Sequence, residues 1–123
     1  MRLLADTHIL LWWLTDADRL TSRQRTLLSD QANIVLVSAV SIAEIEIKRS
    51  IGKLEIVDEY LLSLLNGGFD QLPLLAKHAA LLGTLPWHHR DPFDRLLIAQ
   101  AIAENIPIIT ADSSIRKYDV KTY

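Results

Sequence analysis

Four acidic residues of the sequence lie where a metal site could form, each just after a short apolar run or in the helical pattern that follows one. Asp6 comes directly after RLLA, and Asp112 closely follows IPIIT. Glu44 and Asp94 lie in the first turns of two predicted helices. Carboxylate oxygens are the ligands that Mg²⁺ and Mn²⁺ prefer in proteins. If the four side chains meet, the pattern predicts a divalent-metal site.

The convergence of four carboxylates has a physical cost that favours a bound cation. Two unit charges about 4 Å apart repel by about 4 kcal/mol at an effective dielectric near 20. Four acids without basic partners would therefore destabilise the fold, and a divalent cation would remove that cost. In open α/β sheets, ligands bind outside the carboxyl ends of the strands, which is where these acids are expected.

Each acid also has a plain structural interpretation, which the sequence leaves open. Asp6 suits the N-cap of the helix that follows it, and Asp112 suits a turn. Ser41 and Glu44 have the spacing of a capping box. These local roles compete with metal binding at every position.

The segment HHRDPFDRLLIAQA, residues 88–101, contains two aspartates three residues apart. Asp91 followed by Pro92 is typical of a helix start, with an N-cap acid and proline at the first helical position. Asp94 then lies at the third helical position, where the helix dipole favours an ionised carboxylate. We interpret Asp91 as the cap and Asp94 as the ligand. Arg95, on an otherwise apolar helix, is expected to pair with an acid, because an unpaired buried charge is costly.

The elements that must position these acids alternate between short apolar strands and helices. This alternation favours an α/β fold with a central, mainly parallel sheet of about five strands and helices on both faces. The predicted helices are 8–15, 21–30, 41–53, 58–68, 75–83 and 92–105. The predicted strands are 2–5, 33–38, 69–74 and 106–110, with 119–123 as a final edge strand.

Length, charge and composition narrow the class of protein. The 123 residues suit one domain spanning 1–123, and half of them are hydrophobic. The net charge of −2 excludes a broadly basic, nucleic-acid-seeking surface, so any such contact must be local. There is no cysteine, which excludes thiolate metal sites. No apolar run reaches the roughly 18 residues of a membrane span, and Asp6 interrupts the only stretch like a signal peptide, so we expect a soluble cytoplasmic protein.

The segments LADTH, SAVSIAEIEIK, GKLEI, HRDPFDRLLIAQA and IITAD, in this order, resemble the PIN-domain ribonucleases. More narrowly, they resemble the VapC-like toxins of type II toxin–antitoxin modules. The resemblance runs from residue 3 to about residue 118, and HRDPFDRLLIAQA is its most specific part. One departure is Ala43, where related sequences often have a bulky aromatic residue.

The resemblance implies a PIN-like domain whose acidic quartet is Asp6, Glu44, Asp94 and Asp112. It implies cleavage of RNA by water activated by Mg²⁺ or Mn²⁺, with these acids as metal ligands and catalytic residues. It also implies a homodimer and a cognate antitoxin protein.

Residues near the quartet have less specific expectations. The hydroxyls of Thr7 and Thr110 suit the orientation of carboxylates, although local backbone hydrogen bonding explains them equally well. Arg90, His89 and Lys48 are candidate RNA contacts, but each also fits a solvated loop or helix face.

Two other functions remain as alternatives. A phosphoacceptor receiver domain is also α/β with an acidic Mg²⁺ pocket, but it needs paired acids after the first strand and a lysine after a late strand. The sequence has a single Asp6 and, after IIT, Ala111. A catalytically silent PIN-like interaction module is disfavoured by the presence of all four acids.

Overall fold

The computed structural model describes all residues 1–123, and its centre is a four-stranded sheet in the order β3-β2-β1-β4. Every pair of neighbouring strands is parallel. The strands are β1 (Arg2–Ala5), β2 (Ile34–Ser38), β3 (Asp70–Leu72) and β4 (Ile108–Ile109). The α-helices are α1 (Thr7–Thr15), α2 (Ser22–Ser29), α3 (Ala39–Ser50), α4 (Asp58–Asn66), α5 (Ala76–Ala80) and α6 (Pro92–Glu104). Short 3₁₀ turns occupy Ala17–Arg19, Leu81–Thr84 and Ile115–Lys117.

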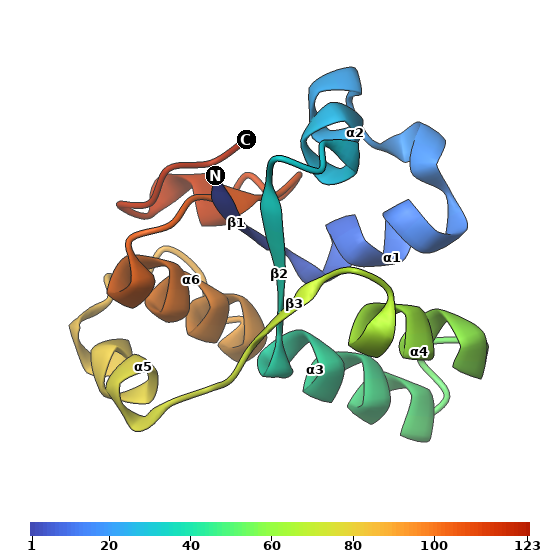
Figure 1. The fold of residues 1–123 in the computed structure, drawn as a ribbon. Helices are drawn as coiled ribbons and strands as arrows, with labels where there is room; N and C mark the ends of the chain where they lie inside the picture. Colours follow the sequence, from blue (N-terminus) through green and yellow to red (C-terminus); the bar gives the residue numbers. More distant parts are fainter.

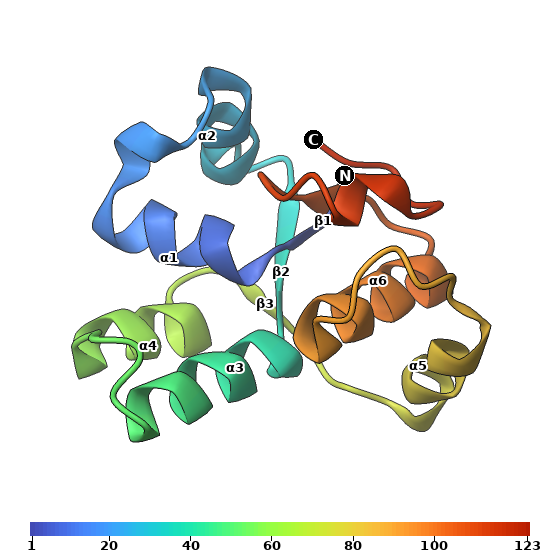
Figure 2. The ribbon, with the colours of Figure 1, turned by 180° about the vertical axis from the view of Figure 1, so that it is seen from behind.

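Helices cover both faces of the sheet, as predicted (Figures 1 and 2). Alternate strand residues face opposite sides. Leu4 and Leu36 therefore pack with α6, whereas Leu3 and Val35 pack with α1, α2 and α4. Helix α3 leaves the end of β2 and contributes to both cores.

The prediction of about five strands is wrong, because the last segment does not form a strand. Residues 119–123 run beside β4, where the backbone of Ile108 accepts from Tyr123 N at 3.0 Å and donates to Lys121 O at 2.9 Å. Only one bridge forms, between Ile108 and Thr122. With β4 itself two residues long, this pairing is too short to count as a strand.

The register sets the edge at which the acids lie. Leu4 is level with both Leu36 and Ile108, so β1, β2 and β4 end close together. In Figure 2, α3 and α6 begin near the lower ends of the strands. The carboxyl edge of the sheet is therefore bordered by the starts of α1, α3 and α6. No helix has the length and apolar character that crossing a membrane requires.

Candidate acidic site at the carboxyl edge of the sheet

Asp6 lies at the end of β1 and is only 2 % exposed. It occupies the N-cap position of α1, but its side chain makes no capping hydrogen bond. Instead Thr110 Oγ1 donates to Asp6 Oδ2 at 2.8 Å. Asp6 Oδ1 is buried and has no partner. Asp6 therefore has the predicted N-cap position but does not cap the helix with its side chain, and one buried oxygen remains open to a ligand.

Glu44 lies on α3, and the capping box predicted from Ser41 is wrong. Helix α3 begins at Ala39, because Ser38 at the end of β2 is the N-cap and its hydroxyl accepts from the Val40 backbone. Ser41 is thus inside the helix, where its hydroxyl accepts from Thr7 Oγ1 at 2.8 Å. Thr7 makes this contact instead of binding one of the acids.

The carboxylate of Glu44 is held on one side only. Lys48, one turn further along α3, places Nζ 2.6 Å from Glu44 Oε2. Glu44 Oε1 is buried and has no partner. Lys48, a predicted RNA contact, is therefore the cation that neutralises Glu44 in this structure.

At the start of α6, Asp91 is the N-cap, as predicted, and Asp94 is not. Asp91 Oδ1 accepts from Asp94 N at 3.0 Å, and Pro92 follows Asp91 as the first helical residue. Asp94 makes no cap of its own, and its Oδ2 lies 3.1 Å from His89 Nε2. The cap thus fixes the turn that carries Asp94.

Asp112 follows β4 and is half-buried. Its Oδ1 accepts from Ser114 N at 2.8 Å, which is the turn role expected of it. Its backbone N–H donates to Thr110 Oγ1 at 3.0 Å. Since the same hydroxyl donates to Asp6, Thr110 connects the two acids across β1 and β4.

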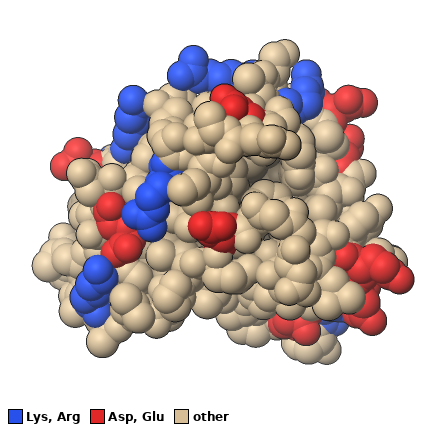
Figure 3. All heavy atoms as spheres, in the orientation of Figure 1, with Lys and Arg blue, Asp and Glu red and all other residues tan.

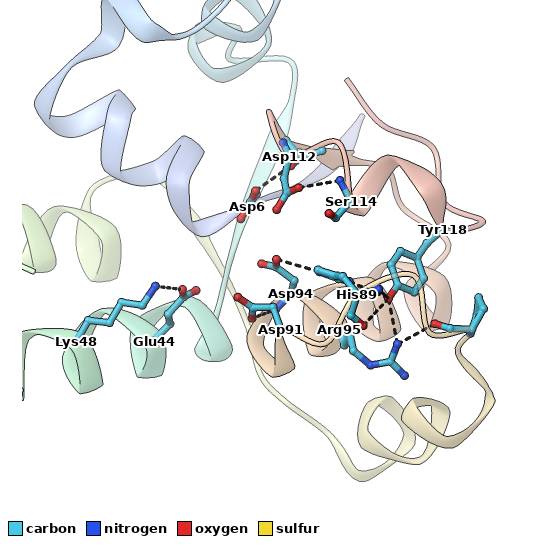
Figure 4. A network of polar contacts seen from close by, with 12 residues as sticks. Asp6, Glu44, Lys48, His89, Asp91, Asp94, Arg95, Asp112, Ser114 and Tyr118 are labelled. Carbon is cyan, nitrogen blue, oxygen red and sulfur yellow. Dashed lines mark hydrogen bonds and ion pairs between the residues drawn. The ribbon is translucent and has the colours of Figure 1, made fainter. Parts of the chain in front are cut away.

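The side chains of Asp6, Asp94 and Asp112 lie around a common space, with Glu44 opposite them on α3 (Figure 4). Burial is the main reason that the pKa of Asp94 rises to about 8. Its other causes are the charges of Asp6, Asp91, Asp112 and Glu44. Burial also raises the pKa of Asp6, partly offset by the Thr110 hydrogen bond. The acids therefore gather closely enough to repel one another.

The donor set fits a hard divalent cation, although the side chains do not form a closed metal cage. No three His, Cys, Asp or Glu side chains converge as a ready-made metal site. However, Mg²⁺ usually keeps several waters and binds through only one or two carboxylates. The two buried oxygens without partners, Asp6 Oδ1 and Glu44 Oε1, are the kind of atoms that a cation satisfies.

Two hollows open beside the acids, and His8 borders both. One, of about 190 Å³, is lined by Asp6, His8, Trp12, Ala111 and Asp112. The other, of about 130 Å³, includes His8, Glu44, Lys48 and Lys53. His8 is exposed and its charge acts to lower the pKa of Asp6. The sequence analysis missed His8, and its position two residues after Asp6 was the available signal.

Arg95 does not pair with an acid, so that prediction is wrong. Its guanidinium donates to Pro86 O at 2.8 Å and to the Tyr118 hydroxyl at 3.0 Å, and it lies 3.8 Å from the centre of the Trp87 ring. The sequence analysis also missed Tyr118, whose hydroxyl lies 2.8 Å from His89 Nδ1. A buried arginine needs acceptors, but nothing in the sequence indicated which ones.

The remaining basic groups give no continuous basic surface on the face in Figure 3, where blue and red atoms are interspersed. Arg90 is exposed in the loop before α6. It is thus accessible to a phosphate, whereas His89 and Lys48 already contact quartet acids.

Fold and site together define a small α/β domain with an acidic centre at the carboxyl edge of a parallel sheet. The chain belongs to the PIN domain family, whose sequence pattern matches residues 3–121. This confirms the resemblance to that family and excludes the receiver-domain alternative.

Solved structures support the same fold. The chain is similar to a chain of VapBC2 from Rickettsia felis bound to a DNA fragment from their promoter, with 17% identity, a TM-score of 0.75, and 100% and 98% of the two chains covered. It is also similar to VapBC-1 from nontypeable Haemophilus influenzae, at 16% identity and a TM-score of 0.72, covering 100% and 97%. FitAcB from Neisseria gonorrhoeae gives 18% identity and a TM-score of 0.64, covering 98% and 96%. No curated protein matches the chain significantly.

Proposed function

We propose that this protein is a metal-dependent endoribonuclease and the toxin of a type II toxin–antitoxin pair. The main observation behind the proposal is that Asp6, Glu44, Asp94 and Asp112 lie near one another, and that one buried carboxylate oxygen of Asp6 and one of Glu44 have no partner. Membership of the PIN family and likeness to VapBC and FitAcB structures support it.

In this proposal Asp6 and Asp94 are the main ligands of Mg²⁺ or Mn²⁺. A bound ion would lower the pKa of a water molecule and neutralise charge on the scissile phosphate. The unpartnered Oδ1 of Asp6 is available to the ion, while Thr110 fixes the other oxygen. Glu44 and Asp112 complete the site or orient the attacking water.

The surroundings of the quartet suggest how RNA would approach. Arg90 is the exposed cation that best suits a phosphate contact. Lys48 would meet RNA only by leaving Glu44, which its partly exposed side chain allows. His8, between the two hollows, borders the approach to Asp6.

The proposal includes a cognate antitoxin protein, a homodimer and a cytoplasmic location. The resemblance to VapC-like toxins and the similarity to the VapBC and FitAcB structures, one of which holds a DNA fragment from their promoter, support this part of the proposal. An antitoxin that covers the acidic edge would silence this chain until it is removed.

The deciding experiment is cleavage of mixed RNA by the purified chain with Mn²⁺, with Mg²⁺ and with EDTA. We expect cleavage with either metal, none with EDTA, and strong loss in Asp6→Asn and Asp94→Asn. Glu59→Gln is the matched control, because Glu59 is an exposed acid on α4 that lines neither hollow beside the quartet. If the wild type leaves all RNA intact, the protein is a silent PIN-like module instead.

A growth assay tests the toxin role separately from the chemistry. Induced expression of the wild type should arrest growth, and the Asp6→Asn variant should not. Cleavage in vitro without growth arrest would retain the nuclease and reject the toxin role.

A further inference from the structure

Asp94 is hydrogen-bonded by a chain of side chains that lies outside the acidic quartet (Figure 4). Arg95 Nη1 lies 3.0 Å from the hydroxyl of Tyr118. That hydroxyl is 2.8 Å from His89 Nδ1, and His89 Nε2 is 3.1 Å from Asp94 Oδ2. Four residues from the end of the loop, from α6 and from the segment after the last 3₁₀ turn thus form one continuous path.

The direction of each hydrogen bond follows from donor chemistry. A guanidinium only donates, so the Tyr118 oxygen accepts from Arg95. The Tyr118 hydrogen then has two acceptors near it, His89 Nδ1 at 2.8 Å and the His89 carbonyl at 3.4 Å. The shorter contact makes Nδ1 the acceptor. A neutral imidazole that accepts at Nδ1 has its hydrogen on Nε2, and this N–H points to Asp94 Oδ2.

We propose that Tyr118 and His89 are positioning residues that fix Asp94 through Oδ2 and leave Oδ1 available to the metal ion. The inference rests on the proposed function only in taking Asp94 as a metal ligand. Partners that orient a ligand in this way typically account for about 10- to 100-fold in metal affinity.

The surroundings of Tyr118 support a rigid role. Its side chain is 4 % exposed, as is that of Arg95. The rings of His88 and His89 pack edge-on against it, with centroids 4.8 and 5.4 Å away. Because both ring nitrogens of His89 are engaged, a phosphate contact by His89 would break the chain. The geometry therefore favours positioning over the RNA contact predicted for His89.

The test measures Mn²⁺ binding without RNA, by electron paramagnetic resonance of the free ion. Tyr118→Phe should weaken Mn²⁺ binding about 10-fold, because it removes the hydroxyl that sets the His89 tautomer. His89→Gln keeps an N–H donor at the reach of Nε2 and should retain most of the affinity. His89→Asn is too short to reach Asp94 and should lose as much as Tyr118→Phe.

Thermal melts first establish that each variant is folded, and a second readout detects the tautomer itself. In ¹⁵N-histidine-labelled wild type, His89 should show a protonated Nε2 and an unprotonated Nδ1. Tyr118→Phe should populate both tautomers. A wild-type His89 protonated at Nδ1, or a Tyr118→Phe protein that binds Mn²⁺ like the wild type, would overturn the proposal.

These readouts separate this inference from the proposed function. If Tyr118→Phe and His89→Asn weaken Mn²⁺ binding but the wild type cuts no RNA, the positioning role of Tyr118 and His89 is supported and the proposed nuclease function is rejected. If the wild type cuts RNA and these variants bind Mn²⁺ normally, the proposed nuclease function is supported and the positioning role of Tyr118 and His89 is rejected. A wild type that binds no Mn²⁺ overturns both.

Discussion

Glu44 and Asp94 lie on opposite sides of the acidic centre, and their partners differ in kind. Glu44 is bound by Lys48, a charged group on the same helix whose side chain is 37 % exposed. Asp94 is bound by His89, whose side chain is 16 % exposed and whose ring is held by a buried tyrosine. The lysine neutralises the charge of its acid, whereas the histidine orients its acid through a hydrogen bond. A metal ion would therefore compete with Lys48 for Glu44, whereas His89 would hold Asp94 in place for the ion.

The largest effects are expected when the charge of each acid is removed in turn. Asp94→Asn should lower the RNA cleavage rate by roughly 100-fold or more, beyond the loss typical of residues that only orient ligands. Glu44→Gln should cost about 10-fold, since Lys48 already offsets its charge. Single-turnover cleavage at saturating Mn²⁺ measures both. Equal losses would show that the two sides do not differ in catalysis.

Arg95→Met removes the buried guanidinium that begins the series of hydrogen bonds leading through Tyr118 and His89 to Asp94. The change leaves the Pro86 carbonyl and the Tyr118 hydroxyl without their donor, and should lower the free energy of unfolding by about 2–3 kcal/mol. Urea denaturation provides the measurement. Arg49→Met is the control, because Arg49 pairs only with the exposed Glu46 and Asp58, and its loss should lower the free energy of unfolding much less. A loss no larger than the control's would contradict the structural role of Arg95.

Lys48→Met should strengthen metal binding, whereas the changes to Asp94 and Glu44 weaken the site. Without the competing ammonium group, Mn²⁺ affinity should rise about fivefold, which corresponds to an ion pair of about 1 kcal/mol. Mn²⁺ titration in the absence of RNA isolates this effect, and Arg49→Met again serves as control. If Lys48 also contacts RNA, the same variant will show a higher KM for cleavage. A weaker Mn²⁺ affinity would mean that Lys48 supports the metal site.

The smallest expected effect is the pH dependence of the metal-free protein. In the folded chain Asp94 has its pKa raised to about 8 from the ordinary 3.8, mainly by burial. Between these pH values the folded state keeps a proton that the unfolded chain has lost, so stability falls as pH rises through this window. The melting temperature should therefore drop from pH 5 to pH 8, and should drop more in the wild type than in Asp94→Asn. Identical slopes in the two proteins would refute this, and saturating Mn²⁺ should reduce the dependence.

The parts of the site that the sequence predicted are those set by short-range signals. Asp91 caps the helix that carries Asp94, and this follows from the three-residue spacing of the two aspartates. Asp6 and Asp112 follow apolar runs that form β1 and β4, so the topology of a parallel sheet was enough to bring them together.

The features that the sequence did not predict involve either a partner far away in sequence or a residue that has two roles. Ser38 both ends β2 and caps α3, so the helix begins earlier than the spacing of Ser41 and Glu44 suggested. One acceptor of Arg95 is Tyr118, 23 residues away, which no local pattern indicates. The fifth strand was overestimated because 119–123 has strand-like composition but only a two-residue neighbour to pair with.

The hydrogen bond between Thr110 and Asp6 joins residues 104 positions apart, and it sets when the centre can exist at all. Asp6 is synthesised long before its partner Thr110, which directly follows β4. Closing so long a loop is slow and comes late in folding. A nascent chain therefore cannot bring the four acids together until β4 has been synthesised and has paired with β1.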